Sequence, residues 1–264
     1  MVSSIEHEAV LRTARALERV GWPVTVVPVD GRGVVAPDDI AQALGPDVAL
    51  VSVMHANNEI GTLQPVAEIG ALARAAGAWC HVDAVQSAGK VALDVEAWGR
   101  AGIDLVALSA HKFGGPKGIG ALWIRRGCTL AATATGGRQE RNRRAGTENV
   151  PGIAGMGAAA EWARPHLLVV DGVTALRDHL ERGIAAAIPG TFVNGEGAPR
   201  IGNKSNVSFD GVEAETLLMA LDLEGIAVST GAACSSGTLE PSHVLLAMGH
   251  PARARASIRF SLGP

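Results

Sequence analysis

The chain of 264 residues contains no tyrosine and only four phenylalanines. Aromatic residues make up 3% of it, which argues against a protein surface on which nucleic-acid bases stack. Charged residues are also few, at 19%, and the formal net charge is −3. A chain with this balance has no strong electrostatic attraction to nucleic acid or to an anionic membrane, so we expect neither as a partner.

Cysteine is equally scarce, with three widely spaced residues and no Cys-x-x-Cys pair. This pattern indicates neither a disulfide framework nor a structural zinc site. Cys80 and Cys128 lie in or just after apolar runs, where cysteine packs as a small hydrophobic residue. Cys234 differs, because it lies in the small-residue stretch STGAACSSGTLEPS, where a reactive thiol is expected. An incidental loop cysteine is the alternative.

Long hydrophobic runs are absent, and none is long enough to cross a membrane. The N-terminal stretch MVSSIEHEAV has neither the basic region nor the apolar core of a secretion signal. Hydrophobic residues nevertheless make up 47% of the chain, which is the composition of a globular protein. We therefore expect a cytoplasmic location.

Lysine is rare, with four residues against nineteen arginines, yet two of the four lie in the stretch SAHKFGGPKGIG at 109–120. Lys112 follows an apolar run and stands beside a serine and a histidine. A lysine held there could lose its hydration and form a Schiff base, although a surface lysine in a turn is the alternative. Lys117 lies inside a Gly-Pro-Lys-Gly turn, which favours a solvated or phosphate-facing cation.

The first part of the chain alternates apolar, β-rich runs with amphipathic helices. This alternation predicts an α/β fold with a mainly parallel sheet and helices on both faces. The expected strands are 24–29, 48–55, 78–83, 104–110 and 119–126, and the expected helices are 6–21, 37–44 and 65–77. Ser3 and Glu6 have the spacing of a capping box, which predicts that the first helix begins there.

The composition changes near Arg164 and Pro165. Beyond this point we expect helices at about 172–187, 212–222 and 241–249, and strands at 204–209, 226–230 and 257–262. This order predicts a smaller C-terminal α+β domain. The expected domains are therefore residues 1–163 and 164–264.

Polar residues follow three of the predicted strands, where ligands bind in parallel sheets. Asn58 follows the first of these strands, Asp83 ends the next, and Gln86 comes three residues later. An aspartate here could hold the ring nitrogen of pyridoxal phosphate (PLP) protonated, whereas a helix-capping aspartate is the alternative. Asn58 could donate to a ring oxygen or simply serve a turn. His7, considered alone, has the pattern of a surface histidine.

An arginine-rich stretch, GGRQERNRRAGTENV, covers residues 136–150. Its glutamates and the acidic net charge make a nucleic-acid patch a weak interpretation. An anion site at Thr147 and the following helix start has better physical support. Arg259 lies within an apolar strand, where we expect it to pair with a carboxylate of the protein or of a ligand.

Six stretches together resemble one family, the PLP-dependent cysteine desulfurases of iron–sulfur cluster assembly, within the class-V aminotransferases of fold type I. They occur in the same order along the whole chain and are specific as a set. They are MHANNEIGTLQP, HVDAVQSAGK, SAHKFGGPKGIGALWIRR, RRAGTENVPG, GAACSSGTLEPSHVLLAMG and SIRFSLG.

The resemblance implies a PLP site. Lys112 would be the Schiff-base lysine, and Asp83 would pair with the pyridine nitrogen. Gln86 and Asn58 would contact the ring oxygen or its surroundings, and Asn58 would also lie beside the substrate. His7 would stack on the ring and help move protons.

The resemblance also implies the rest of the reaction site. Ser109 and His111 would bind the cofactor phosphate, and Thr147 would reach the phosphate of a partner subunit in a homodimer. Arg259 would hold the carboxylate of L-cysteine. Cys234 would take the sulfur as a persulfide, leave L-alanine, and pass the sulfur to an acceptor or iron–sulfur scaffold protein. We expect no metal in the resting enzyme, although Cys234 could contact a cluster transiently.

Members of the family carry a further N-terminal region with a phosphate-binding turn, and they continue beyond the final SLGP. We therefore expect a chain shortened at both ends. Two other functions stay open at this point. One is a related class-V PLP enzyme of the selenocysteine lyase kind, and the other is an inactive shortened chain that serves only as an interaction module.

Overall fold

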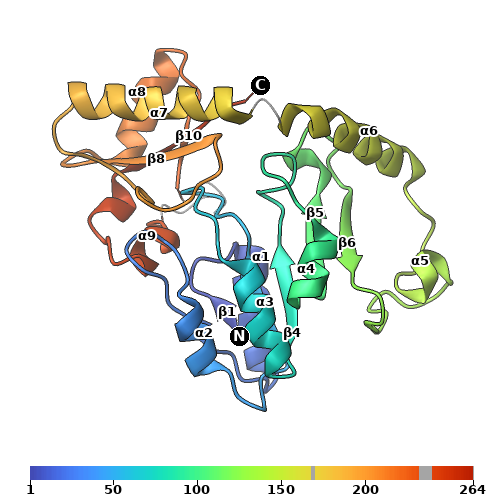
Figure 1. Ribbon diagram of the computed structural model, residues 1–264. Coiled ribbons are helices and arrows are strands. Elements are labelled where there is room, and N and C mark those ends of the chain that lie inside the picture. Colours follow the sequence, from blue (N-terminus) through green and yellow to red (C-terminus); the bar gives the residue numbers. More distant parts are fainter. Residues whose placement is uncertain (168–169, 232–239, 264) are drawn as a thin grey trace.

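The computed structural model describes residues 1–167, 170–231 and 240–263, and these residues fold around two β-sheets (Figure 1). The first sheet has six strands in the order β2-β1-β3-β4-β5-β6. Its strands are β1 (Val2–Ser3), β2 (Val26–Val27), β3 (Leu50–Met54), β4 (Trp79–Asp83), β5 (Leu105–Ser109) and β6 (Gly120–Ile124). All neighbours are parallel except β5 and β6, which are antiparallel.

Helices connect the strands of this sheet, and two further helices follow its last strand. They are α1 (Glu8–Arg19), α2 (Pro37–Ala43), α3 (Val66–Ala75), α4 (Val95–Ala101), the short 3₁₀ helix η1 (Ala110–Lys112), α5 (Gln139–Asn142) and α6 (Val150–His166). The main core lies between the sheet and α2, α3 and α4, where Ile40, Ile69 and Val82 have no exposed surface. This core holds the strands in register, so it positions the polar residues at their carboxyl ends.

The second sheet is antiparallel and has the order β7-β8-β10-β9. Its elements are α7 (Val170–Ala187), β7 (Thr191–Val193), β8 (Lys204–Phe209), α8 (Ala214–Leu223), β9 (Ser229–Thr230), α9 (His243–Ala247), the 3₁₀ helix η3 (Arg253–Arg255) and β10 (Ser257–Ser261). Figure 1 shows α7 and α8 on one side of this sheet and the turns after β3 on the other.

The two faces of the second sheet differ in polarity because side chains alternate along a strand. Val207, Phe209 and Ile258 point toward α7 and α8 and form an apolar core with them. The opposite face carries three pairs of directly opposed polar residues. These pairs are Lys204 with Ser261, Asn206 with Arg259, and Ser208 with Ser257. This polar face therefore looks toward the first sheet.

The fold class predicted from the sequence is confirmed, and most predicted elements occur within a few residues of their expected ends. The strand predicted at 204–209 has these bounds in the structure. The capping-box prediction is wrong, because Ser3 lies in β1 and the helix begins at Glu8 with His7 as its N-cap. The strand β7 and the helix α4 were not predicted. The domain boundary at residues 163 and 164 stays a proposal.

Two general features bear on function. Within the described residues, none of the helices combines the length and the apolar character that crossing a membrane requires. The same residues contain no group of three or more histidine, cysteine, aspartate or glutamate side chains that could hold a metal ion. Cys80 and Cys128 are buried free thiols, as the sequence predicted.

Candidate active site

Asp83 stands at the carboxyl end of β4, between the ends of β3 and β5. It is directly opposite Met54 of β3 on one side and Ala107 of β5 on the other. The N–H of Val85 donates to Asp83 Oδ1 at 2.9 Å, and the N–H of His55 donates to the Asp83 backbone carbonyl at 2.8 Å. These bonds hold the half-buried carboxylate at the edge of the sheet where a ligand would bind.

Asn58 and Arg259 meet although they are far apart in sequence. Arg259 Nη1 on β10 donates to the backbone carbonyl of Asn58 at 3.3 Å. Within the part of the chain that the structure describes, Asn58 Oδ1 and Arg259 Nε are buried and have no hydrogen-bond partner. Buried polar atoms are usually paired, so these two are available to a ligand.

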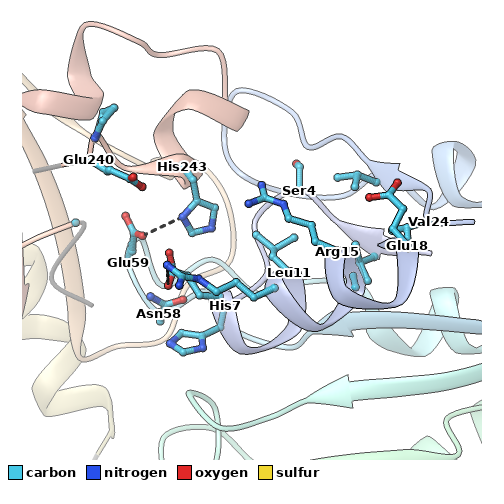
Figure 2. A pocket seen from close by; sticks show the side chains of 17 residues that line it. Ser4, His7, Leu11, Arg15, Glu18, Val24, Asn58, Glu59, Glu240 and His243 are labelled. Atoms are coloured by element: carbon cyan, nitrogen blue, oxygen red, sulfur yellow. Dashed lines mark ion pairs between the residues drawn. The ribbon is translucent and has the colours of Figure 1, made fainter. Parts of the chain in front are cut away.

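His7 joins this group from the start of α1. Its Nδ1 accepts a hydrogen bond from the N–H of Ala9 at 3.2 Å. Because Nδ1 is the acceptor, the proton of the neutral ring lies on Nε2. His7 and Asn58 share the wall of a cavity of about 290 Å³, which Figure 2 shows from close by.

Glu59, next to Asn58, is buried on the same cavity wall, and no signal in the sequence marked it as a site residue. Ser242 Oγ donates to Glu59 Oε2 at 2.5 Å. His243 Nδ1 lies 3.9 Å from Glu59 Oε1, the ion pair that is dashed in Figure 2. Burial raises the pKa of Glu59 to about 7, against the opposing effects of Ser242 and Arg259. Through Ser242 and His243, the Glu59 carboxyl connects the turn after β3 to the start of α9.

Ser109 and His111 are joined to each other at the end of β5, with Ser109 Oγ 2.8 Å from His111 Nδ1. Lys112 follows in η1 and is exposed. The glycine-rich turn behind it folds back closely. A Cβ atom added at Gly115 would lie 2.8 Å from the Cβ of Ala110, so only glycine fits without displacement. The sequence prediction that Lys112 stands at a strand end is thus confirmed, but the side chain is not enclosed.

Three of the four lysines gather at this edge. Lys90 Nζ donates to the Gln86 backbone carbonyl at 2.9 Å and to Gln86 Oε1 at 3.4 Å. Burial and the charge of Lys112 lower the pKa of Lys90 to about 8. Burial also lowers the pKa of Lys204 to about 7, with further contributions from Arg259, Lys90 and Lys112. So many mutually repelling cations favour the binding of an anion.

Glu6 is a second buried carboxyl that the sequence analysis assigned only to capping. It has no exposed surface, it accepts hydrogen bonds from Ser3 Oγ and from the N–H of Met54, and its Oε2 has no partner among the described residues. Burial raises its pKa to about 8, and the charge of Asp83 adds to the effect. Glu6 thus joins Ser3 of β1 to Met54 of β3, close enough to Asp83 for their charges to interact.

One predicted site residue is not part of this group, and another lies outside the described residues. Thr147 is exposed in the loop before α6, and Figure 1 shows α5, which precedes this loop, standing away from the carboxyl edge of the first sheet. Cys234 lies outside the described residues. Gln86 is at the edge, but its side-chain oxygen is engaged by Lys90.

A parallel sheet with Asp83, Asn58 and Lys112 at its carboxyl edge, followed by a second antiparallel sheet, is the architecture of PLP enzymes of fold type I. A family model described as aminotransferase class-V matches residues 1–264, and the chain belongs to this family. The resemblance predicted from the six sequence stretches is thereby confirmed.

Two relatives with curated names share one name. A protein of Dictyoglomus turgidum named cysteine desulfurase IscS is 48% identical over 265 residues, and one of Methanosarcina thermophila with the same name is 49% identical over 265 residues. Both alignments cover 100% of this chain but only 66% and 65% of the relatives. The chain thus spans just under two thirds of their length.

Solved structures agree in fold. One described as a NifS-like protein has a TM-score of 0.88 and 38% identity, covering 99% of this chain and 68% of that chain. Another, described as SspA in complex with cysteine, has a TM-score of 0.83 and 33% identity, covering 100% and 73%. DndA from Streptomyces lividans has a TM-score of 0.82 and 37% identity, covering 98% and 73%.

Proposed function

We propose that the protein is a PLP-dependent cysteine desulfurase. It would take L-cysteine, transfer the sulfur atom to the thiol of Cys234 as a persulfide, and release L-alanine for iron–sulfur cluster or other sulfur-containing cofactor assembly. The observation that carries the proposal is that Asp83 and Lys112 lie at the carboxyl edge of the first sheet, while Arg259 of β10 reaches the turn after β3 at the same edge. The names of the relatives add independent support.

The residues at this edge fit PLP in charge and in hydrogen-bonding capacity. Three lysines and Arg259 provide positive charge for a phosphate and a carboxylate, and Asn58 Oδ1 and Arg259 Nε have no protein partner among the described residues. Asp83 would hold the ring nitrogen, and Ser109 with His111 would bind the phosphate. When bound, PLP supplies an electron-withdrawing ring that stabilises negative charge on the carbon next to the substrate nitrogen.

The side chains of this chain would supply orientation and proton transfer. The amine of Lys112 would hold the cofactor and then carry a proton at Nζ. His7, with Nδ1 occupied by the N–H of Ala9, presents its Nε2–H as a proton donor. Arg259 would hold the substrate carboxylate and so orient the bound cysteine.

The sulfur transfer needs no outside oxidant. The carbon–sulfur bond of cysteine breaks, a sulfur–sulfur bond forms at Cys234, and the proton of the Cys234 thiol is passed on as alanine forms. A homodimer in which Thr147 reaches the partner's phosphate site, and a sulfur-acceptor or scaffold protein, belong to the same proposal. The exposure of Thr147 is compatible with a role between subunits.

The test is the conversion of L-cysteine to L-alanine by the protein with PLP, measured with the variant Cys234→Ser and the control Cys128→Ser. Cys128 is buried, so its thiol is out of reach of the substrate. We expect the control to form alanine and persulfide at the parent rate and Cys234→Ser to form no persulfide. Persulfide formation at the parent rate in Cys234→Ser would exclude the proposal.

A further inference from the structure

Lys204 is a buried lysine beside the proposed substrate site. Only 7% of the surface of Lys204 is exposed, although lysine is rarely buried without an ionic partner. The side chain leaves the polar face of β8, and Nζ donates to Ser261 Oγ on β10 at 3.2 Å. The turn after β3 covers it, because a Cβ atom added at Gly61 would lie 3.2 Å from the Lys204 Cβ.

Arg259 lies on the same face of the second sheet. Lys204 is directly opposite Ser261, so Arg259, two residues earlier on β10, is its diagonal neighbour. Diagonal neighbours on one face are about 7–8 Å apart at the backbone, a separation that two long side chains can bridge. Lys204 and Arg259 therefore direct two cationic groups into the same space.

The groups that act on Lys204 from its surroundings are all cations. They are Arg259 on β10, Lys90 after β4 and Lys112 in η1, and each lowers its pKa. The nearest carboxylate of the covering turn, Glu59, is bound by Ser242 and acts on Arg259 instead. A buried ammonium in such a place is costly unless an anion joins it.

We propose that Lys204 and Arg259 form a two-cation subsite that binds the carboxylate of the amino-acid substrate. The inference rests on the proposed function, in which Arg259 is the carboxylate-binding residue, and it adds Lys204 as a residue that determines affinity for that group. Arg259 Nε, which has no partner among the described residues, would donate to one carboxylate oxygen, and Lys204 Nζ would donate to the other.

Binding and protonation at this subsite are linked. The carboxylate favours the charged form of Lys204, so its binding raises the pKa of Lys204 from about 7. By the same linkage, affinity for the carboxylate falls as the pH rises through that pKa. A lysine with a purely structural role would respond to pH but not to the ligand.

The test uses the protein with PLP, labelled with ¹³C at lysine Cε, whose NMR shift reports the charge of the amine. Only four lysine signals are expected, and single lysine-to-arginine variants assign them. L-alanine, the non-sulfur product, is the probe, and L-alaninamide, which lacks the carboxylate, is its matched control. We expect L-alanine to raise the titration midpoint of Lys204 by at least about one pH unit, equivalent to tenfold tighter binding to the charged form. L-alaninamide should leave it unchanged, and the exposed Lys117 should respond to neither.

A variant gives a second readout. Lys204→Met keeps the apolar stem and removes the charge, so KM for L-cysteine should rise about tenfold or more while kcat changes less than about threefold. Lys117→Met is the control, with both constants at parent values.

The two proposals fail differently. A Lys204 midpoint unmoved by L-alanine, in a protein that forms alanine through Cys234, would overturn the subsite and leave the desulfurase proposal standing. A midpoint that moves with L-alanine, in a protein that forms no alanine from cysteine, would support the subsite and overturn the desulfurase proposal.

Discussion

Replacing Glu6 by glutamine tests whether burial raises the pKa of the Glu6 carboxyl beneath the candidate active site. Glutamine keeps an oxygen that accepts from Ser3 Oγ and the N–H of Met54, and it places an amide where Glu6 Oε2 lies without a partner among the described residues. An unpaired buried amide costs about 1–3 kcal/mol. At pH 5 the carboxyl of the parent protein is protonated and leaves one O–H unpaired at Oε2, whereas glutamine leaves two N–H groups unpaired there, so Glu6→Gln should be the less stable of the two.

The difference should shrink and then reverse as the pH rises. Burial raises the pKa of Glu6 from 4.5 to about 8 in the folded protein. A carboxyl with a raised pKa contributes stability below its unfolded pKa and loses it as the pH rises through the folded value. At about 1.4 kcal/mol per pH unit, the parent should lose about 2–4 kcal/mol relative to Glu6→Gln between pH 5 and pH 8.

The assay is urea unfolding at pH 5, 6.5 and 8, followed by the fluorescence of the five tryptophans. Glu18→Gln is the control, because Glu18 is exposed on α1. The control should differ from the parent by a small and nearly constant free energy of unfolding. If the difference between Glu6→Gln and the parent does not change with pH, the raised pKa of Glu6 is wrong.

Three further predictions concern packing and hydrogen bonding. Gly102→Ala should lower the free energy of unfolding by about 2–4 kcal/mol, because Gly102 has a φ of +116° and the new Cβ would lie 2.1 Å from the Gly70 carbonyl oxygen. The control Gly77→Ala has a φ of +78° but open space around the new Cβ, so it should lower the free energy of unfolding by only about 1–2 kcal/mol; both values are measured by urea unfolding. Asp104→Ala should cost about 1–3 kcal/mol by the same measurement, because it removes the acceptor 2.9 Å from the buried N–H of Cys80. Ser242→Ala should raise the pKa of Glu59 further above 7, seen by ¹³C NMR of the carboxyl, and an unchanged or lower pKa would contradict a hydrogen bond from Ser242 to Glu59.

Much of the fold could be predicted because short apolar runs and helix periodicity are local signals. The strand at 204–209 and the helix at 37–44 are examples, and both occur at or within one residue of the expected bounds. The strand ends carrying Asp83 and Lys112 followed from the same signals. The start of the first helix was misplaced because Ser3 and Glu6 bond to each other across the end of β1 rather than across a helix turn.

The burial of Lys204, Glu6 and Glu59 could not be predicted in the same way. Each depends on segments far away in the chain, as when Ser242 bonds to Glu59 or the turn at Gly61 covers Lys204. One signal was present, since the alternation of polar residues in KSNVSF places Lys204 and Asn206 on one face of a strand. That pattern indicates a polar face, but not what covers it.

In the proposed enzyme, the carboxyl edge of the first sheet binds PLP at Lys112. The most direct measurement is reduction of the protein with PLP by borohydride, followed by mass spectrometry of the modified peptides, with Lys112→Arg and Lys117→Arg as the matched variants. We expect a single modified residue, Lys112, in the parent and in Lys117→Arg, and none in Lys112→Arg. Labelling spread over Lys90, Lys117 and Lys204, or the same labelling in Lys112→Arg, would contradict it.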